Sequence, residues 1–393
     1  MDDRHTHALP PDTRLDCYRI ESVLGSGAFG ITYAAEDLEL HRRVAVKEYF
    51  PAGLAQRAAE GSTIAPTSTA SAELYTYGRA QFMQEARVLA QFAEPNIVRI
   101  HRYMEANDTA YLVMNYEDGH TLGRVLRRFG KLKERQLLAV AMHALRGLSA
   151  LHGKGILHGD IKPANILVRR SGPPLLIDFG AARLAVGRKR GNMKSVMTPP
   201  FSALELFGQE GREGPWTDIY ALGATLFQCA SGQSPCLVTD RLDARQCGRV
   251  DPMAVALGGC SDRLSRELID CIDWMLEPAS NARPQSTGEL LEHLVAIVRG
   301  DTGQERHGPA TQVGPRPPPI QDPLLSAAQA ALTEAVGPIA ALLVERAATD
   351  SADGAMFLEL LASKIPDAEG RGRFMAACNP FIAYANQPAS LPH

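Results

Sequence analysis

The stretch that decides the fold is His158-Gly159-Asp160-Ile161-Lys162-Pro163-Ala164-Asn165, between an apolar helical pattern and a short apolar strand. It brings an acid, an amine and an amide close together in one short segment. A carboxylate can hold a hydroxyl proton, an ammonium group can lie beside a phosphate, and an amide oxygen can bind a metal ion. A polar connection after a helix would look the same, so the rest of the chain has to show whether this segment is a functional site or a plain loop.

The composition is that of an ordinary globular protein. With 393 residues, 45% of them hydrophobic and 22% charged, the chain can form one large two-lobed domain with an appendage, or two to three average domains. The net charge of -3 gives no reason to expect a nucleic-acid or membrane surface as partner. The seven cysteines form no C-x-x-C pair, which favours buried thiols of a cytoplasmic protein. Neither a signal peptide nor a membrane-spanning segment is expected.

The first part of the chain is predicted to be rich in strands. Runs of Val, Ile, Tyr and Thr indicate strands at 18–24, 31–36, 43–48, 97–104 and 110–115. A helix is expected at 79–92, where apolar residues recur at helical spacing. Residues 1–16 are expected to be disordered. The small polar residues of 51–77 predict a surface insertion whose Ser and Thr hydroxyls are possible modification sites.

Beyond residue 117 helices dominate. Apolar periodicity predicts them at 134–152, 217–230, 264–276 and 287–298, and leaves 240–261 unassigned. The change of character near 115–119 is where a cleft would lie.

The C-terminal part begins with a stretch, 300–323, that is rich in Gly and Pro and predicts a linker. Helices are expected at 324–336, 338–348 and 355–364, in a small module that spans 324–393. This module could support a homodimer, dock a partner or inhibit the rest of the chain, and no motif decides among these.

A glycine-rich stretch, Gly25-Ser26-Gly27-Ala28-Phe29-Gly30, fits G-x-G-x-x-G. Glycines let backbone N–H groups approach phosphates closely. A dinucleotide site would require a helix directly afterwards, whereas the next residues look like a strand. A strand-loop-strand flap over phosphates fits better.

Three further residues have suggestive positions. Lys47 ends the apolar run Val44-Ala45-Val46, Glu85 lies on the expected helix, and Asp178 opens Asp178-Phe179-Gly180 after another apolar strand. Each alone could be an edge charge or part of a turn. Glu94 is the alternative to Glu85, but it lies at the end of its helix.

The order of these motifs along the chain argues against the interpretation that each is an unrelated edge charge or turn. Over residues 18–298 the chain resembles the protein kinases, specifically the bacterial serine/threonine kinases of eukaryotic (Hanks) type. The resemblance implies an α+β, two-lobed kinase fold at 17–299. Its N-lobe, to about 116, would be an antiparallel sheet with one helix, and its C-lobe, 117–299, would be mainly helical. An all-α module would follow.

The resemblance also implies an activity. The γ-phosphoryl group of ATP, bound with Mg²⁺ or Mn²⁺, would pass to Ser or Thr hydroxyls of protein substrates and of the chain itself. Asp160 would be the catalytic base and Lys162 would neutralise phosphoryl charge. Lys47, steadied by Glu85, would hold the phosphates, and Thr198 would bridge Asp160 and Lys162. Asn165 and Asp178 would bind the metal ion.

Further residues would surround the nucleotide or support the loops. Those expected around ATP are Gly25, Gly27, Gly30, Thr32, Ala45, Lys47, Met114, Asn115, Tyr116 and Glu117. Asp218 would support the catalytic loop from a buried helix. Glu205 would pair with Arg283.

Three positions depart from the family pattern. Thr32 replaces valine and Leu204 replaces proline, with little expected effect. Gly159 replaces the arginine that usually grips a phosphorylated activation loop, so switching by that route is doubtful. The loop here carries Ser195 and five cations that could receive phosphates, contact an acidic substrate or simply be solvated: Arg183, Arg188, Lys189, Arg190 and Lys194.

Two other functions are compatible with parts of this sequence. A pseudokinase scaffold would bind nucleotide and recruit partners through the C-terminal helices, but such proteins typically lose the lysine, the base or the metal aspartate. A small-molecule kinase is disfavoured by Lys162 and by the Glu205–Arg283 pair.

Overall fold

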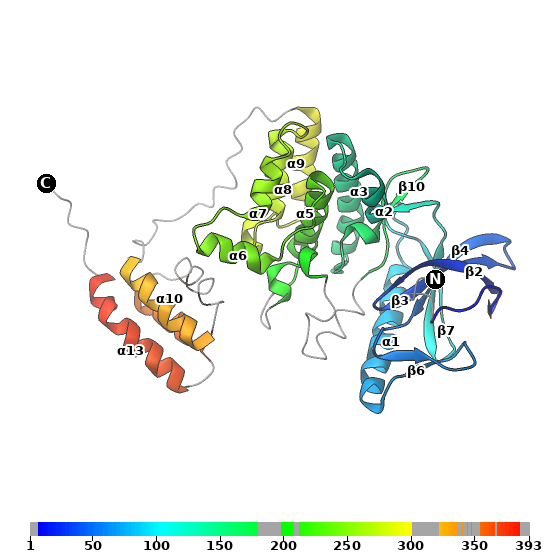
Figure 1. Cartoon of the computed structure of the whole chain (residues 1–393), viewed down its shortest axis with the longest axis horizontal. Helices are drawn as coiled ribbons and strands as arrows, with labels where there is room; N and C mark the ends of the chain where they lie inside the picture. Colours follow the sequence, from blue (N-terminus) through cyan, green and yellow to red (C-terminus); the bar gives the residue numbers. More distant parts are fainter. Residues whose placement is uncertain are drawn as a thin grey trace. The chain divides into compact units, whose positions relative to one another are not determined.

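A computed structural model of the chain describes residues 7–179, 198–207, 212–300, 322–336, 354–365 and 368–385, together with 340, 344 and 347. Contacts between Cα atoms divide the chain into two compact units, Met1–Gln304 and Glu305–His393 (Figure 1). The predicted basic loop around Ser195 and the glycine that follows Phe179 lie outside the described residues.

The first part of the larger unit is an antiparallel sheet. Its order is β1-β2-β3-β4-β8-β7, formed by β1 (Arg14–Leu15), β2 (Tyr18–Gly27), β3 (Gly30–Asp37), β4 (Arg42–Tyr49), β7 (Ile100–Ala106) and β8 (Thr109–Asn115). Helix α1 (Thr69–Leu89) buries Phe82, Met83 and Ala86. The predicted strands are confirmed, and the central strands β4 and β8 are buried along most of their length.

Helix α1 begins ten residues earlier than the sequence predicts. Ser68 caps it by accepting a hydrogen bond from the Ser71 N–H at 3.1 Å, and Tyr75 is buried in its second turn. The cluster of hydroxyls predicts a loop because Ser and Thr favour turns, yet the same residues favour helix N-caps. Before α1, the insertion forms a hairpin of β5 (Ala55–Arg57) and β6 (Ile64–Pro66).

Residues 7–16 are also ordered, against the expectation of a disordered tail. β1 pairs with β2, Leu9 is 2% exposed, and its N–H donates to the Tyr33 hydroxyl at 3.1 Å. A segment so poor in apolar residues gives little sign of this, because its order depends on a tyrosine distant in sequence.

A buried carboxylate, Glu48, ties these parts together. It accepts hydrogen bonds from the hydroxyls of Tyr33 and Tyr111, both at 2.8 Å, and it pairs with Arg57 of the insertion at 2.5 Å. Burial first, and then the charge of Glu48, raises the pKa of each tyrosine, so both hydroxyls keep the proton that they donate. A fully buried carboxylate requires such a complete set of donors.

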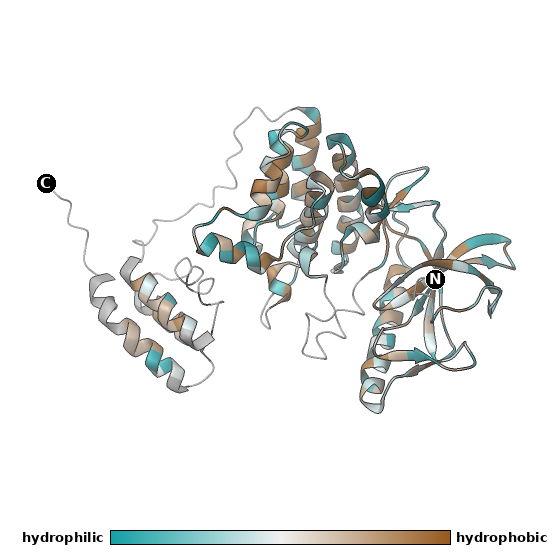
Figure 2. Ribbon diagram, viewed as in Figure 1, coloured by the Kyte–Doolittle hydropathy of each residue, from teal (hydrophilic) through white to brown (hydrophobic). Residues whose placement is uncertain are grey.

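The second part of the larger unit is mainly helical. Its small sheet, in the order β11-β10-β9, contains β9 (Gly119–Thr121), β10 (Ile166–Arg169) and β11 (Leu175–Leu176). Its helices are α2 (Leu122–Phe129), α3 (Glu134–His152), α5 (Pro215–Ser231), α6 (Val238–Gln246), α7 (Pro252–Gly258), α8 (Arg266–Met275) and α9 (Thr287–Arg299). Helix α5 is buried almost throughout. In Figure 2 the apolar colour dominates α5, while α6 shows mainly the hydrophilic colour.

Helices α6 and α7 fill the stretch that the sequence left unassigned. α6 buries Arg241, which pairs with Asp251 at 2.8 Å, and Asp251 caps α7 by accepting from the Met253 N–H at 3.0 Å. A helix whose buried face includes an arginine does not show apolar periodicity, which explains why α6 was missed, and α7, with 7 residues, is too short to show one.

The smaller unit contains α10 (Asp322–Val336), α12 (Gly354–Ala362) and α13 (Ala368–Ala385). Phe357, Leu361 and Phe374 lie in its core, together with Leu324 and Leu332. Helices α10 and α12 were predicted, and most of the helix predicted at 338–348 lies outside the described residues. Helix α13 was missed because its sequence has no clear apolar face. Within the described parts of both units, no helix has the length and apolar character needed to cross a bilayer.

The Glu48 network gives a stability prediction. Glu48→Ala should lower the free energy of unfolding by about 3–5 kcal/mol, because Arg57 would be left buried without its partner. Glu36→Ala on the neighbouring strand removes a surface partner of Arg19 and should cost less than about 1 kcal/mol. Urea denaturation followed by circular dichroism measures both, and equal losses would contradict this account.

Candidate active site

The glycine loop is the turn of a β-hairpin. β2 and β3 remain paired as far as Gly27 and Gly30, and only Ala28 and Phe29 join them. Position 30 requires glycine, because a Cβ there would lie 2.5 Å from the carbonyl oxygen of Glu48. The hairpin places Gly25 opposite Thr32. A strand follows the loop, which is the arrangement of a flap over phosphates and not of a dinucleotide-binding turn.

Lys47, near the end of β4, contacts the carboxylate of Asp178, with 3.0 Å between Nζ and Oδ1. Burial acts to lower the pKa of the Lys47 ammonium, but the charges of Asp178 and Glu85 outweigh it, and the pKa lies above its ordinary value. Lys47 is therefore charged at neutral pH. The sequence predicts Glu85 as its partner; in the structure Glu85 lies half-buried on α1 and acts on Lys47 through its charge.

The catalytic loop gathers three polar side chains around Asp160. Its Oδ2 lies 2.8 Å from Lys162 Nζ and accepts a hydrogen bond from Asn165 Nδ2 at 2.9 Å. Its Oδ1 accepts from the Thr198 hydroxyl at 3.2 Å, and Lys162 Nζ donates to the same hydroxyl at 3.0 Å. Thr198 thus lies between Asp160 and Lys162, which is where the sequence predicts it.

Asp218, at the start of α5, holds the backbone of this loop. Its carboxylate accepts from the N–H groups of His158 and Gly159, both at 2.9 Å, and lies 2.8 Å from His152 Nε2. Burial acts to raise the pKa of Asp218, but His152, His158 and the backbone donors outweigh it, so the pKa lies below its ordinary value. The group is an anion that fixes two consecutive peptide units.

The two residues held by Asp218 have specific conformations, in the side chain of His158 and in the backbone of Gly159. The His158 ring lies against Phe179, with 4.6 Å between ring centroids, and burial lowers its pKa against the opposing charges of Asp218, Asp160 and Asp178. The ring is therefore neutral at pH 7. Gly159 has φ of +73°, a left-handed conformation that glycine adopts without strain.

The expected adenine site lies at the end of β8. Met114 and Ala45 are register partners and both are buried. Asn115 is fixed by His101, with 2.6 Å between Nε2 and Oδ1. In the part of the chain that the structure describes, the backbone of Tyr116 and Glu117 forms no hydrogen bond to other backbone groups. Those groups are available to a base.

Glu205 and Arg283 form a bidentate ion pair. Arg283 Nη1 and Nη2 donate to the two carboxylate oxygens at 2.9 and 3.0 Å, and the Thr217 hydroxyl donates to Oε1 at 2.8 Å. Arg283 is buried. The pair joins the segment after Thr198 to α5 and to the loop before α9.

The donor set around Asp178 and Asn165 fits a hard divalent cation. Asn165 Nδ2 donates to the carbonyl and carboxylate oxygens of Asp160 and to the carbonyl oxygen of Asp178, at 2.9–3.1 Å. These acceptors fix the amide orientation and leave its oxygen without a hydrogen bond among the described residues. One amide oxygen and one carboxylate are the oxygen ligands that Mg²⁺ prefers. No cluster of three His, Cys, Asp or Glu is found in the described ranges.

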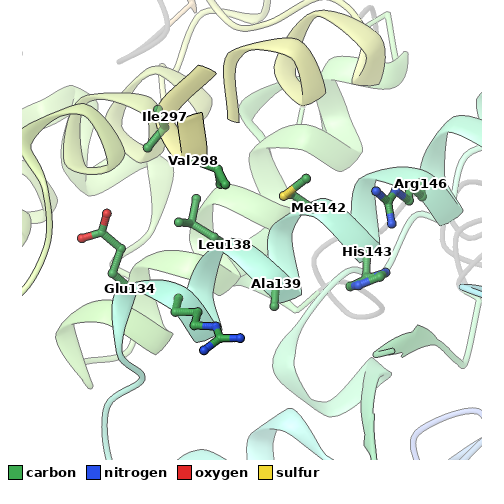
Figure 3. A pocket seen from close by; sticks show the side chains of 9 residues that line it. Glu134, Leu138, Ala139, Met142, His143, Arg146, Ile297 and Val298 are labelled. Carbon is green, nitrogen blue, oxygen red and sulfur yellow. The ribbon is translucent and has the colours of Figure 1, made fainter. Parts of the chain in front are cut away.

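A pocket of about 660 Å³ opens elsewhere, between α3 and α9 (Figure 3). Leu138 and Met142 of α3 point toward Ile297 and Val298 of α9. None of the predicted site residues lines it.

His152 is a site residue that the sequence reasoning missed. It ends α3, and the apolar pattern of that helix gives it no distinction. Its partner Asp218 lies 66 residues further along the chain, so no local spacing signals the pair.

Comparison with known proteins agrees with this geometry. Residues 18–295 match the protein kinase domain family, and 323–387 match a domain of unknown function. The chain is 32% identical to the serine/threonine-protein kinase PknA of Nostoc sp. over 56% of its own length and 37% of that protein. It is 34% identical to PknD of Mycobacterium tuberculosis over 56% of its own length and 30% of that protein. The chain thus spans about a third of the length of these relatives.

A solved structure, the apo form of PpkA-294, aligns with a TM-score of 0.65 and 33% identity, and the match covers 74% of this chain and all of that one. Figure 1 shows the corresponding strand-rich and helical parts. The chain belongs to the protein kinase family.

Proposed function

We propose that the chain is a serine/threonine protein kinase that transfers the γ-phosphoryl group of ATP to protein hydroxyls, its own included. The observation that carries this proposal is the arrangement around Asp160. One carboxylate oxygen contacts Lys162 and Asn165 and the other contacts Thr198. A hydroxyl substrate beside Asp160 would find a proton acceptor next to a cation that offsets phosphoryl charge.

Each polar side chain of the site has its own role in the proposed phosphoryl transfer. Asp160 orients the substrate hydroxyl and accepts its proton, while Lys162 stabilises charge on the transferred group. Lys47, which contacts Asp178 at 3.0 Å, would contact phosphate oxygens, and Asp178 and Asn165 would hold the metal ion. A bound Mg²⁺, or Mn²⁺ in its place, would supply positive charge that offsets the charge of the phosphates. The open backbone of Tyr116 and Glu117 would hydrogen-bond adenine.

No contact among the described residues favours the pseudokinase interpretation. Lys47, Asp160, Asn165 and Asp178, whose loss would argue for it, are present and lie together. We further propose that the kinase domain spans 17–299, followed by a linker at 300–323 and a partner-binding or dimerising module at 324–393, in a cytoplasmic protein. The unit boundary between Gln304 and Glu305 supports this division.

Gly159 bears on regulation. The position lacks the guanidinium that would clamp a phosphorylated loop, so we propose that loop phosphorylation is not the main switch.

Substitution of the residue proposed to contact phosphate, or of one proposed to bind the metal ion, tests the kinase activity. Lys47→Met and Asp178→Asn should each reduce autophosphorylation to background, because the first removes the phosphate contact and the second a metal ligand. Incorporation of labelled phosphate from ATP with magnesium measures this. Glu36→Ala, on the sheet surface, serves as control and should stay active; transfer that persists in both site variants would refute the assignment of roles.

Substitutions at Thr198 and at Ser195, three positions earlier in the sequence, should have different effects. Thr198→Ala should lower kcat about 10- to 100-fold, because the hydroxyl links two charged groups and such hydrogen bonds contribute about 1.5–3 kcal/mol. Ser195→Ala should have a mild effect, since Gly159 provides no clamp for a phosphate there. Steady-state kinetics with a peptide substrate measures both. A large loss from Ser195→Ala would show that another cation replaces the missing arginine.

The smaller unit is tested by comparing the full chain with one that ends at Gly300. If the unit mediates dimerisation, the shorter chain should be monomeric in light scattering while the full chain is not; if it inhibits, the shorter chain should be more active. If both chains have the same oligomeric state and the same activity, partner docking remains as the role of the unit.

A further inference from the structure

The insertion after β4 is hydrogen-bonded to the tip of the glycine loop. The Phe50 N–H donates to the carbonyl of Phe29 at 3.2 Å, and the Ala52 N–H donates to the carbonyl of Ala28 at 2.7 Å. Ala28 and Phe29 are the two residues that join β2 to β3. The loop is therefore attached to the chain beyond β4 at both residues of its turn.

The loop has few other restraints. Residues 24–28 are all exposed, and a Cβ at Gly25 would meet nothing within 4 Å. A segment with so little buried surface depends on its backbone hydrogen bonds to keep one position.

The segment that offers the Ala52 N–H is itself fixed. Gly53 has φ of +77°, and the N–H groups of Leu54 and Ala55 both donate to the Pro51 carbonyl at 3.1 Å. Leu54 is 3% exposed. Residues 51–55 thus form a tight turn whose apolar side chain is anchored in the core.

Two further connections hold this turn in place. The Thr67 N–H donates to the Leu54 carbonyl at 2.9 Å, and Thr67 directly precedes the Ser68 cap of α1. On the other side, Arg57 joins the hairpin to buried Glu48 and to the carbonyl oxygens of His7 and Ser62 at 2.6 and 2.8 Å. The turn is therefore braced against α1, β4 and the N-terminal segment.

We propose that Ala52 is a positioning residue for ATP. Its backbone N–H holds the glycine loop at a fixed distance from the bound phosphates. The turn 51–55 therefore determines the affinity for nucleotide and does not change the rate of phosphoryl transfer. The inference rests on the proposed kinase function. Backbone N–H groups of a glycine loop bind phosphates only when the loop lies close above them. A loop released from Ala52 would spend part of its time away from the phosphates. The apparent affinity for ATP would then fall in proportion to the fraction of time that the loop spends in the binding position.

The first test removes the donor. Ala52→Pro, in the full chain, deletes the N–H and should raise the KM for ATP about fivefold, the factor that corresponds to one backbone hydrogen bond. The kcat and the KM for a peptide substrate should stay within about twofold. Ala52→Gly retains the N–H and should leave the KM for ATP close to that of the parent chain.

A second pair covers the case in which Ala52→Pro does not fold. Gly53→Ala and Gly61→Ala both place a side chain at positive φ, +77° and +86°, with nothing within 4 Å of the new Cβ. Their local strain is similar, but only Gly53 adjoins Ala52. Gly53→Ala should raise the KM for ATP and Gly61→Ala should not, at equal melting temperature.

Two outcomes overturn the inference: a KM for ATP that is unchanged in a folded Ala52→Pro chain, or equal effects in Gly53→Ala and Gly61→Ala. Calorimetric titration of ATP with magnesium separates this inference from the kinase assignment. If the parent chain binds ATP without transferring phosphate, the proposed function fails, while the ratio of dissociation constants between Ala52→Pro and the parent chain still decides the role of Ala52.

Discussion

The contact on which the active site depends most is the one between the Asp218 carboxylate and the backbone of the catalytic loop. Two consecutive N–H groups and one imidazole converge on a buried anion. Because α5 is buried on nearly all sides, the anion has a fixed position, and so do the peptide units of His158 and Gly159. The side chains of Asp160, Lys162 and Asn165 follow within six residues, so their mutual geometry depends on a buried group of another element, α5.

The strand-rich part uses the same physical device for a different purpose. Glu48 is also a buried carboxylate whose partners come from distant segments, here two strands and the insertion. In both cases the free energy gained from hydrogen bonds has to exceed a large desolvation cost, which only a complete donor set allows. Buried anions of this kind specify which loops meet, whereas the apolar core around them mainly supplies stability.

The sequence revealed the fold through the order of short motifs, each weak alone. The glycine loop, Lys47, Asp160, Asn165 and Asp178 were predicted because their chemistry is local and their neighbours are apolar strands. The early start of α1, the helices α6 and α7, and the order of residues 7–16 were not predicted. In each case the stabilising partner is remote or polar: Ser68 as a cap, Asp251 for Arg241, and Tyr33 for Leu9.

The bracing of the glycine loop has a consequence for how the loop can move. In many two-part clefts a flexible flap lifts by itself. Here the loop, the turn at 51–55 and α1 form one hydrogen-bonded body, and α1 also carries Glu85. A displacement of the loop that preserves these bonds must therefore carry the turn and α1 with it, so that the loop moves as part of a collective motion on a slower timescale than a free loop.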